Sequence, residues 1–253
     1  MIKMEHTVSV NAEQMKSIIE GMRNPMNSWS KSDSDWYAIS DEEDKQSVIE
    51  HDSENDLDYL LGHNDYELMR KLSMAGTDHR KFMRMIPVYV RITAPLYWWK
   101  EFDTYKVGTV SNSCSTMHKI TSKEFTEQDF STDRLGSRYY NPTDDIFAIE
   151  FPGEQPFNAT CTDVLRLLIN ILNYYRKKYI DTGDKEYWWK IIQLLPSSYN
   201  QTRNVMLNYE VLANIYKSRK NHKLDEWREF CKWIETLPYA EELICYEREE
   251  GLK

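Results

Sequence analysis

The chain has 253 residues, of which 41% are hydrophobic and 29% charged, and this is the composition of a globular protein with a proper core. Its eight glycines form neither G-x-G-x-x-G nor G-x-x-x-x-G-K-[ST], which excludes the glycine-rich phosphate loops of dinucleotide-binding and P-loop proteins. The net charge of −9 disfavours broad, non-specific binding to nucleic acid, although it leaves room for a local basic pocket.

Neither the amino terminus nor the cysteines indicate a secreted, membrane or metal-binding protein. The first residues lack the apolar core of a signal peptide, and no apolar run approaches the length of a membrane span. The four cysteines are scattered without C-x-x-C spacing, so neither a zinc site nor a disulfide framework is indicated. We therefore expect a reduced, cytoplasmic protein that holds no metal.

Hydrophobic periodicity predicts a helix-dominated α+β domain. Alternating residues indicate strands over 6–10 and 85–93. Helices are expected over 11–22, 64–76, 94–110, 162–175, 184–195, 205–219 and 223–236. Two stretches rich in turn-forming and acidic residues, 24–56 and 121–160, are expected to be polar insertions in a single domain that spans 1–253.

Side chains that cap helices indicate where the helices start. Asn11 and Gln14 form a capping-box pattern before the first helix. Pro87 is expected at the start of the second strand or at a sheet edge, because it cannot donate a backbone hydrogen bond. The expected caps of the second and fourth helices are Asn64 or Asp65, and Thr162 or Asp163.

The segment 195–219 carries an arginine at an unusual place. On a helix that starts near Met206, Asn208 and Arg219 lie on one face with apolar residues, because each residue turns the helix by about 100°. Burying an unpaired guanidinium is costly. Arg219 therefore either serves a site or extends to water at the helix C-terminus, where the helix dipole favours a positive charge.

The same segment resembles the C-terminal motif of the flavin-dependent thymidylate synthases. That motif is Leu-Pro, a spacer, and then Asn-x-Arg-x-Leu-x-x-Phe-Leu-x-x-Arg. The residues that match it without a gap are Leu195-Pro196, Asn208, Leu212 and Arg219. Glu210 stands in place of the middle arginine, which is a charge reversal. The resemblance implies that Arg219 contacts the uracil ring and raises its reactivity, and that Asn208 and Asn214 line the flavin pocket.

The resemblance continues more weakly upstream. His79, ahead of Phe82, resembles the Glu-His that begins the family's first core strand. Counting on from Ala94-Pro95, which resembles a later turn, places two further motifs of the family. Its Arg-His-Arg signature falls on Thr104-Tyr105-Lys106, and its Ser-x-Arg phosphate loop falls on Cys114-Ser115-Thr116. None of the three signature residues is kept, although Lys106 keeps a positive charge.

The resemblance implies two groups of site residues. The residues expected beside the flavin are His79, Thr104, Tyr105, Lys106, Asn208 and Asn214. The residues expected to bind the substrate are Glu101, Asn112, Ser113, Cys114, Ser115, Thr116 and Arg219, of which Arg219 is also the expected catalytic residue. The arginines that could replace the missing ones are Arg84, Arg91, Arg134 and Arg138.

The residue types at these positions also allow less specific interpretations. Hydroxyls and backbone amides over 111–116 suit phosphate, but such clusters are as often serine-rich surface turns. Cys114 is expected to be an inert, buried thiol, since a nucleophile needs a nearby cation that lowers its pKa. The pairs Trp98-Trp99 and Trp188-Trp189 are expected to pack in a core or between subunits rather than on a planar ligand.

The resemblance also implies an architecture and a reaction. We expect an antiparallel sheet packed with several helices, in a homotetramer whose active sites form between subunits. The reaction would transfer a one-carbon unit from methylenetetrahydrofolate to the uracil of dUMP, with reduced FAD as the cofactor and NADPH reducing the flavin. Two other hypotheses stay open: a divergent enzyme of this fold that modifies another pyrimidine nucleotide, and a catalytically inactive nucleotide-binding or structural homologue.

Overall fold

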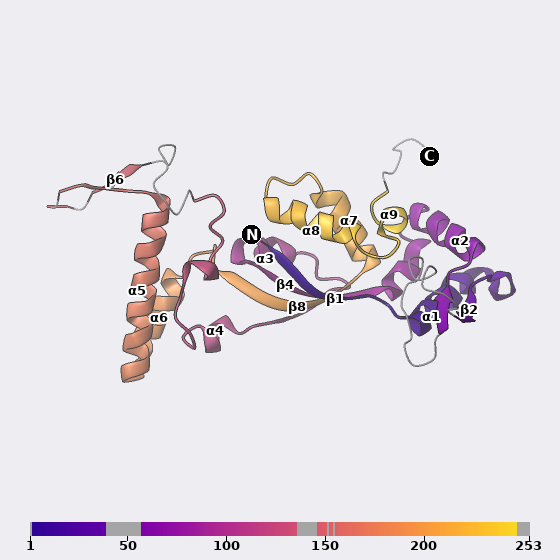
Figure 1. The fold of residues 1–253 in the computed structure, drawn as a ribbon, viewed down its shortest axis with the longest axis horizontal. Coiled ribbons are helices and arrows are strands. Elements are labelled where there is room, and N and C mark those ends of the chain that lie inside the picture. Colours follow the sequence, from indigo (N-terminus) through magenta and orange to yellow (C-terminus); the bar gives the residue numbers. More distant parts are fainter. Residues whose placement is uncertain (1, 39–56, 136–145, 151, 154, 247–253) are drawn as a thin grey trace. The chain divides into compact units, whose positions relative to one another are not determined.

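The structure is a computed structural model that describes residues 2–38, 57–135, 146–150, 152–153 and 155–246 (Figure 1). The chain divides into two compact units, each assembled from separate stretches. The first unit contains Met1–Lys3, Thr93–Asp103 and Ser113–Arg203, and the second contains Met4–Ile92, Thr104–Asn112 and Asn204–Lys253. The single domain expected over 1–253 stays a prediction.

Three sheets hold the strands of the described residues. The largest has the strand order β1-β4-β8-β5, formed by β1 Lys3–Val8, β4 Pro87–Pro95, β8 Asn200–Asn208 and β5 Val110–Ser113. Two antiparallel hairpins pair β2 Asp35–Ala38 with β3 Leu57–Leu60, and β6 Phe147–Ile149 with β7 Phe157–Ala159. The hairpins involve the stretches expected as polar insertions, parts of which fall outside the described residues.

Helices form the larger share of the regular structure, and the expected α+β class is confirmed. The α-helices of the described residues are α1 Ala12–Arg23, α2 His63–Met74, α3 Leu96–Phe102, α4 Thr116–Lys119, α5 Cys161–Thr182, α6 Lys185–Leu194, α7 Tyr209–Arg219, α8 Asp225–Glu235 and α9 Ala240–Leu243. Short 3₁₀ helices are η1 Asn24–Met26, η2 Trp29–Lys31, η4 Arg80–Met85 and η5 Glu127–Asp129. In the described part of the chain, no helix has the length and apolar character needed to cross a membrane.

The core of the first unit is built on one stripe of α5. Leu165, Ile169 and Leu172 recur at helical spacing and are buried, so they form the covered face of that helix. The side chains that pack with them are Ile120, Phe125, Phe130 and Ile191. α6 lies beside α5 as the second arm of a helical hairpin (Figure 1). Trp98 and Trp99 of α3 are also buried, as expected for core packing.

The second unit is held together by a buried ion pair between α1 and α2. Arg23 Nε donates to Asp65 Oδ1 at 2.5 Å, and the two side chains are only 4% and 0% exposed. The other carboxylate oxygen of Asp65 accepts from the hydroxyls of Ser32 and Ser34 at 2.6 and 2.7 Å. Burial alone would raise the pKa of Asp65, but the hydrogen bonds from Ser32, Ser34 and Arg23 outweigh it and lower that pKa.

The starts of the first two helices differ in how well they were predicted. The capping box of Asn11 and Gln14 is confirmed, since each side chain accepts from the other residue's backbone N–H at 2.9 Å. The cap expected at Asn64 or Asp65 is wrong, because α2 starts after Gly62. The Asp65 carboxylate is instead used in the buried ion pair. The residue types that favour a helix cap therefore indicated the region in which α2 starts, but not the residue at which it starts.

The expected start of α5 is also wrong, by two or three residues. The helix starts after Thr160 rather than at Thr162 or Asp163. Thr160 forms a capping box with Asp163, in which the Thr160 hydroxyl accepts from the Asp163 backbone and the Asp163 carboxylate accepts from the Thr160 backbone. Asp163 thus serves the cap from the third helical position.

Strand β8 replaces the first part of the helix expected over 205–219. Val205 and Leu207 are buried at a period of two, which is the pattern of a strand with one covered face. α7 begins only at Tyr209, so Asn208 precedes the helix instead of lying on its apolar face. Sheet pairing thus outweighed the helical periodicity of a short apolar run. The helix ends at Arg219, so that part of the prediction is confirmed.

The helix expected over 94–110 is much shorter, and the loop expected over 111–116 begins as a strand. α3 ends at Phe102, and β5 starts at Val110. Between them Gly108 has a φ of +79°. This left-handed backbone conformation costs little free energy only for glycine, and it is incompatible with a continuing right-handed helix.

Candidate functional site

Arg219 lies between two aromatic side chains of the second unit. Its Nε donates to the Tyr105 hydroxyl at 2.9 Å. The guanidinium carbon lies 4.7 Å from the centroid of the Trp227 ring and 5.7 Å from that of Tyr105. Cation–π attraction and the hydrogen bond therefore hold the half-buried guanidinium in one orientation. We refer to Arg219, Tyr105 and Trp227 as the Arg219 cluster.

Asn208 connects α7 to the segment that carries Tyr105. Its Oδ1 accepts from the backbone N–H of Val211 at 3.0 Å, which caps the helix. Its Nδ2 lies 3.5 Å from the carbonyl oxygen of Gly108, to which it donates. A Cβ at Gly108 would lie only 2.6 Å from Asn208 Nδ2, so this close approach requires glycine. Asn208 therefore serves the local structure with both ends of its carboxamide.

The segment expected to carry the flavin signature contains an unused buried hydroxyl. Thr109 Oγ1 is buried, and no group of the described residues forms a hydrogen bond with it. Thr104 and Lys106 are exposed. The orphaned hydroxyl is notable because buried polar groups almost always have a partner.

Glu210, the residue with reversed charge, is buried and pairs with the buried Arg80 and the exposed Arg84. Its carboxylate contacts Arg80 Nε at 3.4 Å and is also paired with Arg84. Burial would raise the pKa of Glu210, but the hydrogen bond and charge of Arg84, with a smaller contribution from Arg80, outweigh it and lower that pKa. Arg80 Nη2 also donates to Asn214 Oδ1 at 3.0 Å. Arg84 thus neutralises Glu210, and Asn214 is exposed but engaged by the protein.

We expect Glu210→Arg, which restores the arginine of the resembled motif, to destabilise this chain by about 3 kcal/mol. It would leave Arg80 buried without its carboxylate and add a like charge beside it. Chemical denaturation measures the effect. The double variant Arg80→Glu/Glu210→Arg should recover part of the loss, because opposite charges face each other again. Equal stability of Glu210→Arg and the wild type would contradict this account.

The other residues expected beside the flavin or substrate in the second unit are exposed. His79 precedes η4 and makes no side-chain cap hydrogen bond, and Asn112 lies in β5. Arg91 is exposed on β4. The structure therefore brings together Arg219 and Tyr105, and separately Arg80 and Asn214, whereas the role expected for His79 stays a prediction.

In the first unit, two of the expected substrate-binding residues line a cavity of about 370 Å³, here called the Cys114 cavity. Its lining side chains are Thr93, Cys114, Ser115, Lys119, Ile120, Ser122, Lys123, Gln128, Asp129, Tyr199, Asn200, Gln201 and Thr202. The Cys114 backbone is fixed on β8, since its N–H donates to Thr202 O at 2.9 Å and its carbonyl accepts from Gln201 Nε2 at 3.2 Å. Lys123 pairs with Asp129.

The remaining expected substrate residues lie near or apart from this cavity within the first unit. Ser115 Oγ accepts from the backbone N–H of His118 at 3.1 Å, at the start of α4. Thr116 is the first residue of α4, and Ser113 is exposed at the end of β5. Glu101 lies half-buried on α3 and is not among the residues that line the cavity. Arg134 is exposed, and Arg138 lies outside the described residues.

Cys114 is exposed, so the expectation that it is a buried thiol is wrong. Cys114 directly follows β5, all four residues of which are exposed, and this explains the difference. We expect iodoacetamide to alkylate Cys114 and Cys161 in the native protein, since both are exposed. Cys231 should stay unlabelled, because burial raises the pKa of this thiol to about 12. Peptide mass spectrometry distinguishes these sites, and labelling of Cys231 before Cys114 would contradict the structure.

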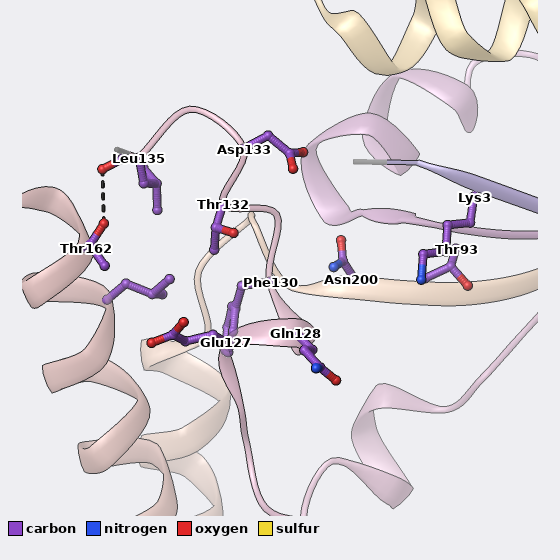
Figure 2. Close-up of a pocket in the computed structure, with 11 residues that line it drawn as sticks. Lys3, Thr93, Glu127, Gln128, Phe130, Thr132, Asp133, Leu135, Thr162 and Asn200 are labelled. Atoms are coloured by element: carbon purple, nitrogen blue, oxygen red, sulfur yellow. Dashed lines mark hydrogen bonds between the residues drawn. The ribbon is translucent and has the colours of Figure 1, made fainter. Parts of the chain in front are cut away.

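A second cavity of the first unit was not predicted from the sequence. It encloses about 400 Å³ and is here called the Asn200 cavity. Its lining residues are Lys3, Thr93, Glu127, Gln128, Phe130, Thr132, Asp133, Leu135, Thr162, Leu165 and Asn200 (Figure 2). They come from separate stretches of the chain, so no motif or spacing could have indicated them. No group of three or more His, Cys, Asp or Glu in the described residues could hold a metal ion.

Comparison with solved structures assigns the fold. The chain has the fold of the flavin-dependent thymidylate synthases, as the C-terminal motif predicted. It is similar to thymidylate synthase ThyX from Helicobacter pylori, solved with FAD and dUMP, with a TM-score of 0.56 and 15% identity over 96% of this chain and 97% of that chain. A second structure of that enzyme with FAD and dUMP gives a TM-score of 0.54 and 15% identity over 100% and 99% of the two chains.

A related methylase is similar over the same extent. It is the UMP/dUMP methylase PolB from Streptomyces cacaoi, bound with 5-Br dUMP, with a TM-score of 0.52 and 13% identity over 98% of this chain and 96% of that chain. No protein-family model matches the sequence, and neither does the sequence of any curated protein. The likeness is therefore one of fold, carried by structure at low sequence identity.

Proposed function

We propose that the chain is a pyrimidine-nucleotide enzyme of the flavin-dependent thymidylate synthase type, which adds a one-carbon unit to the uracil ring of dUMP. The observation that carries the proposal is the Arg219 cluster, which stands where the resembled motif has its closing arginine. Further support comes from the ligands of the similar structures, two solved with FAD and dUMP and one with a brominated dUMP.

The proposed role of Arg219 is to polarise the uracil ring. A guanidinium stays charged and presents a planar fork of N–H donors. Hydrogen bonds from these donors to a ring carbonyl oxygen would stabilise negative charge that develops as the ring is activated. Tyr105 and Trp227 hold the group in place, so little reorganisation is needed when the substrate binds.

The Cys114 cavity of the first unit is proposed, by itself, to bind a phosphate group. Lys119 and Lys123 bring two ammonium groups to it against the single carboxylate of Asp129, so an anion is favoured there. Ser115 and Ser122 add hydroxyls, which can donate to phosphate oxygens. The volume of about 370 Å³ is within the usual range for small-molecule sites.

Residues 104–110 fit FAD through two groups. Lys106 is an exposed cation that suits a diphosphate, and the Thr109 hydroxyl is buried without a partner among the described residues. Asn208 and Asn214 offer less than the resemblance implies, because their carboxamides are engaged by the protein. When bound, FAD would supply the reducing equivalents for the transferred carbon, with methylenetetrahydrofolate and NADPH as the proposed co-substrates.

A homo-oligomer, a tetramer by the resemblance, is part of the proposal. Val164, Leu167 and Tyr174 lie on one stripe of α5 and are 39%, 48% and 56% exposed, so this helix is apolar on a second face. An apolar face of this kind is typical of a subunit contact.

We expect Leu167→Glu to lower the molar mass measured by light scattering, whereas Lys177→Glu on the same helix should not. An unchanged mass for both variants would contradict a contact at this face.

A second candidate function is a different modification of a pyrimidine nucleotide by the same fold. Glu210 favours it, because the arginine of the resembled motif is replaced by a carboxylate that is itself neutralised by Arg80 and Arg84. The substrate, rather than the fold, would then differ. A thermal-shift panel of pyrimidine nucleotides separates the two candidates, since the nucleotide that raises the melting temperature most identifies the preferred substrate.

Tritium release tests the proposed reaction. The purified protein is incubated with dUMP labelled at C5, FAD, NADPH and methylenetetrahydrofolate, and the label released into water is counted. Release that depends on each component supports the proposal. No release above the Arg219→Ala background, in a sample that binds dUMP, would exclude the reaction and leave the second candidate.

A further inference from the structure

One short segment of the Cys114 cavity is held at its two ends. It runs from Cys114 to Ile120 and supplies Ser115 and Lys119 to the cavity lining. The segment follows the exposed strand β5, and its helix α4 has 4 residues, too few to be stable on its own. Ile120 packs in the core of the first unit, whereas Cys114 is bound to β8. The positions of Ser115 and Lys119 therefore depend on how Cys114 is held.

Two hydrogen bonds hold Cys114 on β8. Its N–H donates to the Thr202 carbonyl at 2.9 Å, and this bond needs no side chain. Its own carbonyl accepts from Gln201 Nε2 at 3.2 Å. The second bond requires that the Gln201 carboxamide present its nitrogen to Cys114, because its oxygen cannot donate. The orientation of one carboxamide thus decides whether both bonds form.

Arg203 fixes that orientation. Its Nε donates to Gln201 Oε1 at 2.9 Å. A guanidinium has only donors, so the carboxamide turns its oxygen to Arg203 and its nitrogen to Cys114. Arg203 is itself held by two contacts. Its guanidinium carbon lies 4.1 Å from the centroid of the buried Trp99 ring, and its Nη1 donates to Asp103 Oδ1 at 2.7 Å. We refer to Asp103, Arg203 and Gln201 as the Arg203 network.

The Arg203 network lies within the first unit and reaches the cavity through one residue. Gln201 is among the residues that line the Cys114 cavity, and Arg203 is not. The Asp103 carboxylate pairs with the guanidinium, so the two together add little net charge near an anion in the cavity. Arg203 therefore acts on the cavity through Gln201 rather than by contact with its occupant.

We propose that Arg203 is a positioning residue of the phosphate site in the Cys114 cavity, and that Asp103 supports it by holding the guanidinium against Gln201. The inference rests on the proposed function, since it needs a phosphate site in this cavity. An intact network keeps the segment on β8, so its side chains are in place before phosphate binds and less ordering is needed on binding. Breaking the network at Asp103 or Arg203 weakens phosphate binding without removing a group that contacts phosphate.

Protection of Cys114 from iodoacetamide by inorganic phosphate measures the affinity of this cavity. Cys114 is exposed and lines the cavity, so bound phosphate should slow its alkylation. Cys161 is also exposed but is not among the lining residues, so its alkylation rate is the internal reference. The phosphate concentration that gives half of the maximal protection, at constant ionic strength, is the dissociation constant for this cavity.

Asp103→Asn separates positioning from simple charge, because the two predict opposite changes in phosphate affinity. The substitution removes a negative charge near an anion site, so charge alone would tighten phosphate binding. Weakening the Arg203 network should instead raise the dissociation constant about 3-fold or more, the contribution of one hydrogen bond. Asp103→Glu, which restores the carboxylate, should recover most of the affinity. The Asp103 side chain is 48% exposed, so both variants should fold, which their melting temperatures check.

Two further variants break the network at its other members. Arg203→Lys keeps the positive charge but not the planar fork that donates to Gln201 and Asp103 together, so it should also weaken phosphate binding. Gln201→Met has a similar length without a donor and should raise the dissociation constant about 10-fold. In the Gln201→Met background, Asp103→Asn should cause no further weakening, because both substitutions act through the same contact.

Asp181→Asn is the matched control. It makes the same change at an exposed position of α5 and should leave the dissociation constant unchanged. If phosphate protects Cys114 in the wild type, and Asp103→Asn and Arg203→Lys bind phosphate at least as tightly, this inference is overturned while the phosphate site stands. If phosphate does not protect Cys114 in the wild type, the proposed phosphate site fails and this inference fails with it.

Discussion

Arg219→Ala is expected to lower the rate of tritium release from dUMP by about 100-fold or more, with little change in fold. Losing one preorganised donor to a developing negative charge typically costs a factor of about 10² to 10³. The side chain is only half-buried at the end of α7, so its removal leaves no large internal void. The rate at saturating dUMP and the melting temperature together measure the effect.

Two further variants show whether the fork geometry of Arg219 matters. Arg219→Lys keeps the charge but not the planar pair of donors, so we expect it to recover only part of the rate. Lys217→Ala, an exposed change on the same helix, should leave the rate unchanged. A fully active Arg219→Ala variant would remove the observation on which the proposed function rests.

Asp65→Asn is expected to produce the largest loss of stability of any single substitution considered, about 3–5 kcal/mol. The change leaves Arg23 buried without its charge partner. The matched control is Glu229→Gln, which breaks an exposed pair with Lys232 and should cost no more than about 1 kcal/mol. Denaturant midpoints measure both changes. Equal midpoints for the two variants would contradict a stabilising role for the buried pair.

The same carboxylate makes the stability depend on pH. The pKa of Asp65 is lowered in the folded state, so its contribution is complete above the unfolded value of about 3.9 and is lost as the pH falls through the folded value. The wild type should therefore lose stability below about pH 4, and Asp65→Asn should lose less over that range. Identical acid dependence of the two proteins would show that Asp65 does not titrate in this way.

Local signals predicted the elements better than they predicted their ends. The stripe of α5 and the capping box of Asn11 depend on neighbours within a few residues, and the sequence shows both. The start of α7 does not depend on near neighbours alone, because the run before Tyr209 is apolar at spacings that suit a helix or a strand. Its pairing in the sheet decides for the strand, and pairing partners are distant in the chain.

The residues of the candidate site likewise divide into those that a local motif predicts and those whose contacts depend on the fold. A motif identified Arg219, but Tyr105 and Trp227, which hold it, follow from the fold alone. The pairing of Glu210 with Arg80 joins residues far apart in the sequence, so the charge reversal could be seen without its compensation. The Asn200 Oδ1 has no hydrogen-bond partner among the described residues, which is a property of the packed structure that no composition or spacing predicts.

The visible absorbance spectrum of the purified protein, titrated with FAD and then with dUMP, tests the central claim most directly. The account predicts saturable FAD binding, with a flavin spectrum distinct from that of free FAD, and a further spectral change on addition of dUMP. Arg219→Ala should reduce the response to dUMP and leave FAD binding in place. A spectrum that stays the sum of protein and free FAD, unchanged by dUMP, would contradict a flavin-dependent nucleotide enzyme.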